Sequence, residues 1–197
     1  MNKLFNTTGP CHPQEHYMLP TQERCEGLTD LIGRRQYFVI HAARQSGKTT
    51  LLLELAQQLN DSEEYYALYC SLETVQGITA AKEGIPAILR VMKTQVNFSQ
   101  HLRTYPVAKQ LQEADFNTVW REALTYFSET LDKPLVILFD EVDCLANGTL
   151  ISFLRQLRDG YVNRGNIPFV HSIALVGMRN IRDYQSRIRE ERDTLGS

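Results

Sequence analysis

Four apolar runs stand out along the chain, and none of them alternates with polar residues. They are QYFVIH at 36–41, YYALYCSL at 65–72, PLVILF at 134–139 and VHSIALV at 170–176. Each run is rich in β-branched or aromatic residues and has the length of a strand. A strand without alternation has apolar neighbours on both faces, which is typical of a buried parallel sheet.

Between these runs, apolar residues recur every three or four positions, which is the period of an amphipathic helix. A further short helix is expected around 21–34, and the Gly- and Pro-bearing residues 1–20 are expected to form an irregular arm. Strands separated by such helices predict an α/β fold, a three-layer sandwich with a mainly parallel sheet, for the core domain at 21–197. The apolar stripes are Leu51, Leu55 and Leu59; Ile85, Ile88, Leu89, Met92 and Val96; Trp120, Leu124, Phe127 and Leu131; and Leu150, Leu154, Leu157 and Tyr161.

Composition excludes some classes of function. With 197 residues the chain can form one domain with a substantial core. Its formal net charge of -2 gives no overall field that would attract nucleic acid or an anionic membrane. The longest apolar stretches are too short to span a bilayer, and the four cysteines are scattered, as in proteins of a reducing compartment. We therefore expect a cytoplasmic protein without a membrane or nucleic-acid partner.

The segment HAARQSGKTT at 41–50 follows the first run and ends like a phosphate-binding loop (Walker A). Such a loop joins a strand to a helix start, whose N–H groups converge on phosphate oxygens. Lys48 would reach the β- and γ-phosphates and Thr49 would ligate Mg²⁺. Ala42, where glycine is usual, fits if its φ is negative. The alternative is the capped start of an ordinary helix. The predicted nucleotide-binding residues are Ala43, Arg44, Gln45, Ser46, Gly47, Lys48, Thr49 and Thr50.

A second motif lies roughly ninety residues further on, where PLVILFDEVD ends an apolar strand in Asp140 and Glu141 (Walker B). In phosphoryl-transfer enzymes the strand-end acid holds the metal, and the next acid orients the attacking water. We therefore predict Asp140 as a metal ligand and Glu141 as a catalytic residue. The alternative is a plain strand end with solvated acids. The two motifs together, in the right order and each on an apolar run, favour the nucleotide site.

Other polar residues are weaker candidates. Arg179 follows the fourth run in IALVGMRN, and a cation there could stabilise charge on the γ-phosphate; the alternative is a solvated arginine, with Arg182 as competitor. Glu73 ends the second run near the expected nucleotide face of the sheet. His41 is expected to be a packed histidine on a buried strand. A metal site at Cys11, His12 and His16 is disfavoured because no fourth ligand is apparent.

The chain resembles the prokaryotic AAA-like ATPases close to the STAND class of signal-transduction NTPases. The resemblance covers essentially the whole length and rests on FNTTGPCHPQEHYMLP, HAARQSGKTT, LFDEVD, FLRQLRDGYVNRG and ALVGMRN. It implies ATP and Mg²⁺ as ligands, a loop that commonly opens with alanine, and a sheet order of 5-1-4-3-2. It also implies that Arg179 is a sensor and that residues around His16 and Tyr17 cover the adenine.

The resemblance further implies slow ATP hydrolysis that serves as a conformational switch, with an unknown protein partner. Relatives run on into a fifth strand and a helical lid, so we expect weak turnover and self-association through the edge at 36–41. Two other functions stay open. One is a catalytically silent nucleotide-binding module that serves partner interaction. The other is a DNA-associated ATPase helper, which the acidic balance of the chain disfavours.

Overall fold

The computed structural model describes residues 3–6, 9, 11, 14–17, 27–43, 45–107 and 115–177. Its centre is a sheet of four parallel strands in the order β1-β4-β3-β2. This order matches the 1-4-3-2 part of the arrangement that the resemblance implied. The observed bounds differ from the predicted runs by at most two residues at either end: β1 Tyr37–His41, β2 Tyr66–Ser71, β3 Leu135–Asp140 and β4 Ser172–Gly177.

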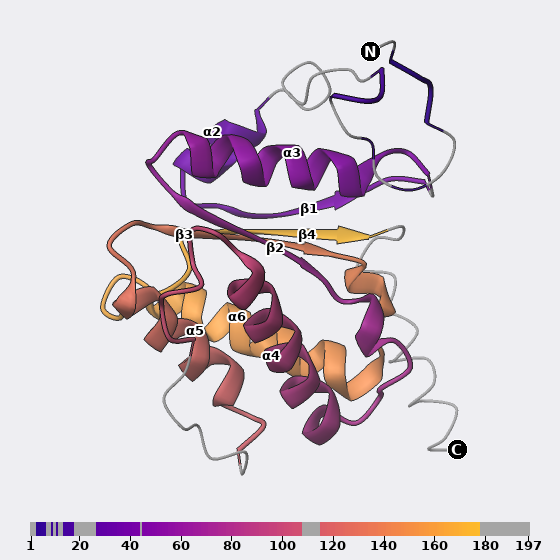
Figure 1. Cartoon of the computed structure of the whole chain (residues 1–197). Helices are drawn as coiled ribbons and strands as arrows, with labels where there is room; N and C mark the ends of the chain where they lie inside the picture. The colour runs from indigo at the N-terminus through magenta and orange to yellow at the C-terminus, as the bar shows by residue number, and fades with distance from the viewer. Residues whose placement is uncertain are drawn as a thin grey trace.

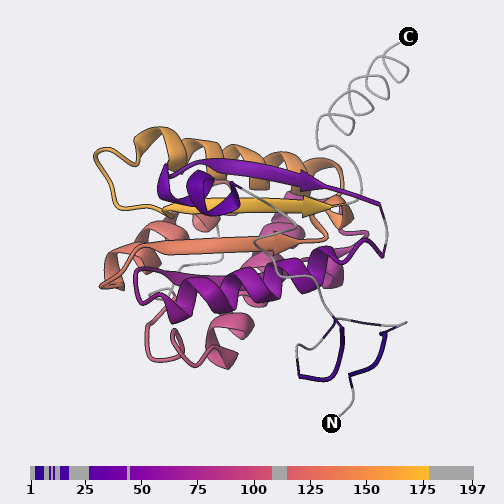
Figure 2. The same cartoon turned by 90° about the horizontal axis from the view of Figure 1, so that it is seen from above.

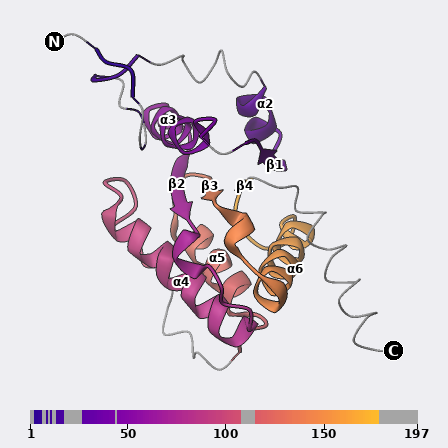
Figure 3. The same cartoon turned by 90° about the vertical axis from the view of Figure 1, so that its right-hand side faces the viewer.

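Helices cover both faces of this sheet, as the sequence predicted (Figure 1). One face carries α2 and α3, and the other carries α4, α5 and α6, which the view along the sheet also shows (Figure 3). Two single-turn 3₁₀ helices, η1 and η2, follow β2 and β3. The bounds are α2 Leu28–Gly33, α3 Lys48–Asp61, η1 Glu73–Val75, α4 Ala81–Phe98, α5 Val119–Thr130, η2 Val142–Cys144 and α6 Asn147–Asn163.

The sheet separates two apolar clusters. Along β3, Val136 and Leu138 belong to the cluster beneath α2 and α3, while Ile137 and Phe139 belong to the larger cluster beneath α4, α5 and α6. Successive side chains of a strand point to opposite faces, so a central strand must be apolar at every position when both faces are covered. All of β3 is accordingly buried, which explains its unbroken apolar run.

The first strand is less buried than its sequence predicted. Within the described residues β1 pairs only with β4, so it lies at an edge of the sheet. Val39 is 46% exposed and His41 is exposed. The prediction of a packed histidine on a buried strand is therefore wrong. The apolar run at 36–41 identified a strand, but it carried no information about the strand's position in the sheet.

The described part of the N-terminal arm lies beside the start of α3 (Figure 2). A single parallel bridge between Leu4 and His16 folds the arm back on itself, and the rings of Phe5 and Tyr17 lie 5.0 Å apart. The predicted helix at 21–34 is observed from Leu28 onward, and residues 21–26 lie outside the described residues. Among the helices described, none has the length and apolar character to cross a membrane.

Candidate functional site

The loop between β1 and α3 has the backbone of a tight turn that opens a helix. Gly47 caps α3 with a φ of 81°, a left-handed conformation that glycine adopts without strain. Gln45 also has a positive φ, of 59°. Ala42 is not among the described residues with a positive φ, so the alanine that opens the loop meets no strain there. Ala42 therefore fits the predicted loop, which required that its φ not be positive.

Lys48, the first residue of α3, turns its side chain back over this loop. Its Nζ donates hydrogen bonds to the carbonyl oxygens of Ala42, at 3.1 Å, and Ala43, at 2.9 Å. The residue is only 8% exposed, and a buried ammonium group needs such partners. The two carbonyls carry only partial negative charge, so an anion in the loop would be a stronger partner for the same cation.

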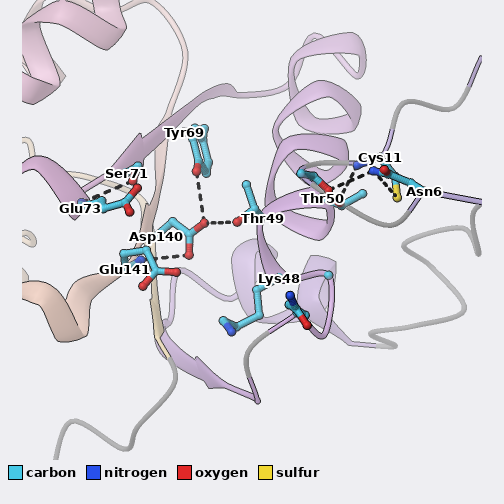
Figure 4. A pocket seen from close by; sticks show the side chains of 13 residues that line it. Asn6, Cys11, Lys48, Thr49, Thr50, Tyr69, Ser71, Glu73, Asp140 and Glu141 are labelled. Atoms are coloured by element: carbon cyan, nitrogen blue, oxygen red, sulfur yellow. Dashed lines mark hydrogen bonds between the residues drawn. The ribbon is translucent and has the colours of Figure 1, made fainter. Parts of the chain in front are cut away.

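Thr49 and Asp140 bring the two sequence motifs together. The Thr49 hydroxyl donates a hydrogen bond of 2.7 Å to Oδ2 of Asp140, which is 1% exposed at the end of β3 (Figure 4). The hydroxyl of Tyr69, on the neighbouring strand β2, donates to the same oxygen at 3.2 Å. Burial, and then the charge of Asp140, raise the pKa of Tyr69, so the phenol stays protonated and remains a donor.

Glu141 leaves the strand in a left-handed conformation, with a φ of 54°. Its backbone N–H donates to Oδ1 of Asp140 at 2.9 Å, which restricts the rotation of the Asp140 carboxylate. Burial, followed by the charges of Asp140 and Asp143, raises the pKa of Glu141, whereas Lys48 acts in the opposite direction. A raised pKa makes this carboxylate a stronger base than a free glutamate.

The end of β2 supplies polar groups that the sequence did not single out. Ser71 is paired in register with Asp140, and Tyr69 lies two residues earlier on the same face. Glu73, which the sequence placed near this face, also lines the pocket. Cys70 is fully buried in the larger apolar cluster, and burial raises its pKa to about 12. The thiol is therefore part of the core, whereas Tyr69, Ser71 and Glu73 line the pocket.

These groups surround a pocket of ≈ 680 Å³, within the size range of ligand sites. Its walls come from the N-terminal arm, the loop and start of α3, the end of β2 and the end of β3 (Figure 4). The described lining residues are Asn6, Gly9, Cys11, Gln45, Gly47, Lys48, Thr49, Thr50, Tyr69, Ser71, Glu73, Asp140 and Glu141.

The arm forms its wall of the pocket with different residues from those that the resemblance suggested. The Cys11 N–H donates to the hydroxyl of Thr50 at 3.1 Å, and the Asn6 amide donates to the Gly9 carbonyl at 3.0 Å. His16 and Tyr17 are not among the lining residues, and Tyr17 is 57% exposed. The resemblance rests partly on the segment that contains Asn6, Gly9 and Cys11, but the sequence did not mark them as lining residues, because their position depends on how the arm folds onto α3.

The remaining predicted site residues divide into two groups. Ala43 offers its carbonyl to Lys48, and Ser46 is exposed in the loop. Arg44 and Arg179, together with the competitor Arg182, lie outside the described residues. Their predicted roles therefore stay predictions from the sequence and the resemblance.

Three features define a P-loop nucleotide-binding domain. They are a parallel sheet covered by helices, a glycine-capped loop that opens a helix after β1, and an acid at the end of β3, which β4 separates from β1. The family model described as AAA domain matches residues 32–185, and the chain belongs to this family. Membership implies nucleotide binding. No curated protein matches the chain.

Proposed function

We propose that the protein binds ATP together with Mg²⁺ and hydrolyses it slowly, using the nucleotide as a conformational switch. The observation that carries this proposal is the 2.7 Å contact between Thr49 Oγ1 and Asp140 Oδ2. It places the two groups that phosphoryl-transfer enzymes use to hold Mg²⁺ at one point of the pocket. The preference for ATP, and the STAND-like switch, come from the resemblance of the sequence.

The phosphates would lie against the loop and the first turn of α3. Backbone N–H groups at a helix start have no partner within the helix and attract anions. Lys48 would exchange the carbonyls of Ala42 and Ala43 for oxygens of the β- and γ-phosphates. This exchange replaces two neutral acceptors by charged ones, which makes stronger hydrogen bonds.

The residues present fit Mg²⁺. A hydroxyl and a carboxylate supply the hard oxygen ligands that this cation prefers, and it usually completes its shell with waters and substrate phosphates. Among its described lining residues, the pocket has more negative than positive charge, since three acids, Asp140, Glu141 and Glu73, face one lysine. A nucleotide without a cation would be repelled there, so Mg²⁺ would supply the charge that phosphate oxygens need. No group of three or more described His, Cys, Asp or Glu residues could hold a metal ion alone.

Hydrolysis would rest on Glu141. Its carboxylate lines the pocket beside Asp140, and its raised pKa suits a group that orients a water and accepts a proton from it. Arg179 would stabilise charge that develops on the γ-phosphate, as the resemblance implies. The left-handed backbone of Glu141 supports this proposal, because strained conformations often occur at functional sites.

The main alternative is a nucleotide-binding module without turnover, in which the fold serves a protein partner. The same pocket supports it, and only the rate of phosphate release separates the two functions.

Self-association through the exposed edge of β1 is a second expectation from the sequence. Sedimentation of the wild type and of Val39→Lys would test it, because a lysine on an edge strand opposes edge-to-edge pairing.

Calorimetry with ATP and Mg²⁺ tests the proposal. Lys48→Ala should weaken binding by about tenfold to a hundredfold, because a hydrogen bond to a charged group contributes roughly 1.5–3 kcal/mol. Lys93→Ala is the matched control, since Lys93 is an exposed lysine on α4 that does not line the pocket. Equal affinities of the wild type and Lys48→Ala would remove Lys48 from the site.

A further inference from the structure

Tyr69 lines the pocket, and neither sequence motif contains it. It is on β2, in register with Leu138 of β3, and its ring packs against the smaller apolar cluster beneath α3. This position carries its hydroxyl up to the end of the strand, where it meets Asp140 at 3.2 Å (Figure 4). The partly buried ring packs against this cluster, which limits the directions from which its hydroxyl can approach the carboxylate.

Both oxygens of Asp140 are held by hydrogen bonds. Oδ1 accepts from the Glu141 N–H, and Oδ2 accepts from the hydroxyls of Thr49 and Tyr69. A carboxylate can accept several such bonds, and each one restricts its rotation. Under the proposed function, Thr49 would also ligate Mg²⁺ through a lone pair of its oxygen, and its O–H could still donate to Oδ2. Tyr69 would have no metal to ligate, so its hydroxyl would serve only to hold Oδ2.

We propose that Tyr69 is a positioning residue that keeps the Asp140 carboxylate oriented for Mg²⁺ in the nucleotide complex. This inference rests on the proposed function, because it concerns the metal end of the same pocket. Tyr69 acts through Asp140 and needs no contact with nucleotide or metal. Its contribution should therefore appear in the benefit that Mg²⁺ brings to nucleotide binding, and not in nucleotide binding itself.

The test is Tyr69→Phe, which removes the hydroxyl and keeps the packed ring. ATP affinity is measured by calorimetry with Mg²⁺ and with EDTA, and the ratio of the two dissociation constants gives the coupling between metal and nucleotide. Tyr69 would act on the metal only through Asp140, so its loss should cost no more than an ordinary hydrogen bond and lower this ratio by about threefold to tenfold. The affinity in EDTA should stay unchanged, and the Mg²⁺ concentration for half-maximal binding should rise.

Tyr66→Phe is a closely matched control. Tyr66 is the first residue of the same strand, and its hydroxyl also donates to an aspartate, Asp132, at 3.0 Å. This contact does not line the pocket. Tyr66→Phe should therefore keep the wild-type coupling ratio. Thermal melting of both variants shows whether the loss of each hydroxyl changes the stability of the fold.

The outcomes separate the inference from the proposed function. A wild type that binds no ATP overturns the proposed function and the inference with it. A wild type with a clear Mg²⁺ effect that Tyr69→Phe retains overturns the inference alone. Equal weakening in Mg²⁺ and in EDTA also overturns it, because that result would mean that Tyr69 only supports the shape of the pocket.

Discussion

Thr49 and Asp140 are 91 residues apart in the sequence, and a hydrogen bond of 2.7 Å joins their side chains. The contact connects the first turn of α3 to the end of β3. The fold places both side chains, Thr49 through the start of α3 and Asp140 through the end of β3. Preorganised groups of this kind do not have to be brought together when ligand binds, which favours both affinity and catalysis.

The first prediction separates turnover from binding. Glu141→Gln should lower phosphate release by about a hundredfold or more, the range expected for loss of a general base. ATP binding should persist, because the amide keeps the size of the side chain and loses only its role in the transition state. Phosphate release at saturating Mg-ATP is the measurement. If the wild type and the variant both release phosphate at the background rate, the silent binding module is favoured.

The second prediction concerns Asp140. Asp140→Asn removes the charge that would hold the cation under the proposed function, and the ratio of ATP affinities in Mg²⁺ and in EDTA should fall by about tenfold or more. Asp132→Asn is the control, because Asp132 also accepts hydrogen bonds from two tyrosine hydroxyls but lies outside the pocket. An unchanged ratio in Asp140→Asn would exclude this carboxylate as a metal ligand.

The third prediction tests how the N-terminal arm is attached. Thr50→Val keeps the shape of the side chain but leaves the Cys11 N–H without its acceptor. The arm should open more often, so a thiol reagent should label Cys11 about twofold to tenfold faster, as expected from loss of one hydrogen bond. Mass spectrometry gives the rate for each cysteine. Half-buried Cys144 is an internal reference, and its labelling should not change. Equal Cys11 rates in the two proteins would mean that other contacts hold the arm.

The fourth prediction concerns the packing of α4 against α6. A Cβ added at Gly84 would lie 2.2 Å from Oγ1 and 2.8 Å from Cβ of Thr149, which is fully buried. Gly84→Ala should therefore destabilise the fold by about 1–2 kcal/mol, since overpacking outweighs the gain in helix propensity. Thermal or denaturant unfolding measures the change. Gly33→Ala is the control: its Cβ would meet nothing within 4 Å, so this variant should be neutral or slightly more stable.

Much of the fold could be predicted from periodicity alone. The strands of the sheet follow from unbroken apolar runs, because a strand covered on both faces is apolar at every position. The helices α3 to α6 follow from apolar stripes, because each helix buries only one face. The exposure of His41 could not be predicted in this way. It depends on which strand lies at the edge, and strand order is a property of the whole chain.

The site was predictable where local sequence determines local structure. Gly47, Lys48 and Thr49 belong to one turn, and Asp140 and Glu141 belong to one strand end, so each motif can be read by itself. Tyr69 and Cys11 could not be found, because a register between strands and a contact across the fold place them in the pocket. The roles assigned to Arg44 and Arg179 rest on sequence alone.

Because the sheet divides the core into a larger and a smaller apolar cluster, we expect the two halves of the pocket to differ in local stability. The smaller apolar cluster attaches α3, and with it Lys48 and Thr49, to the sheet, whereas β3 also contributes to the larger cluster. A layer with fewer buried contacts opens at a lower free-energy cost, so the amide hydrogens of α3 should exchange faster than those of β3. A nucleotide held by both halves would oppose this opening by mass action. Nucleotide occupancy would then appear in the hydrogen-exchange rate of α3.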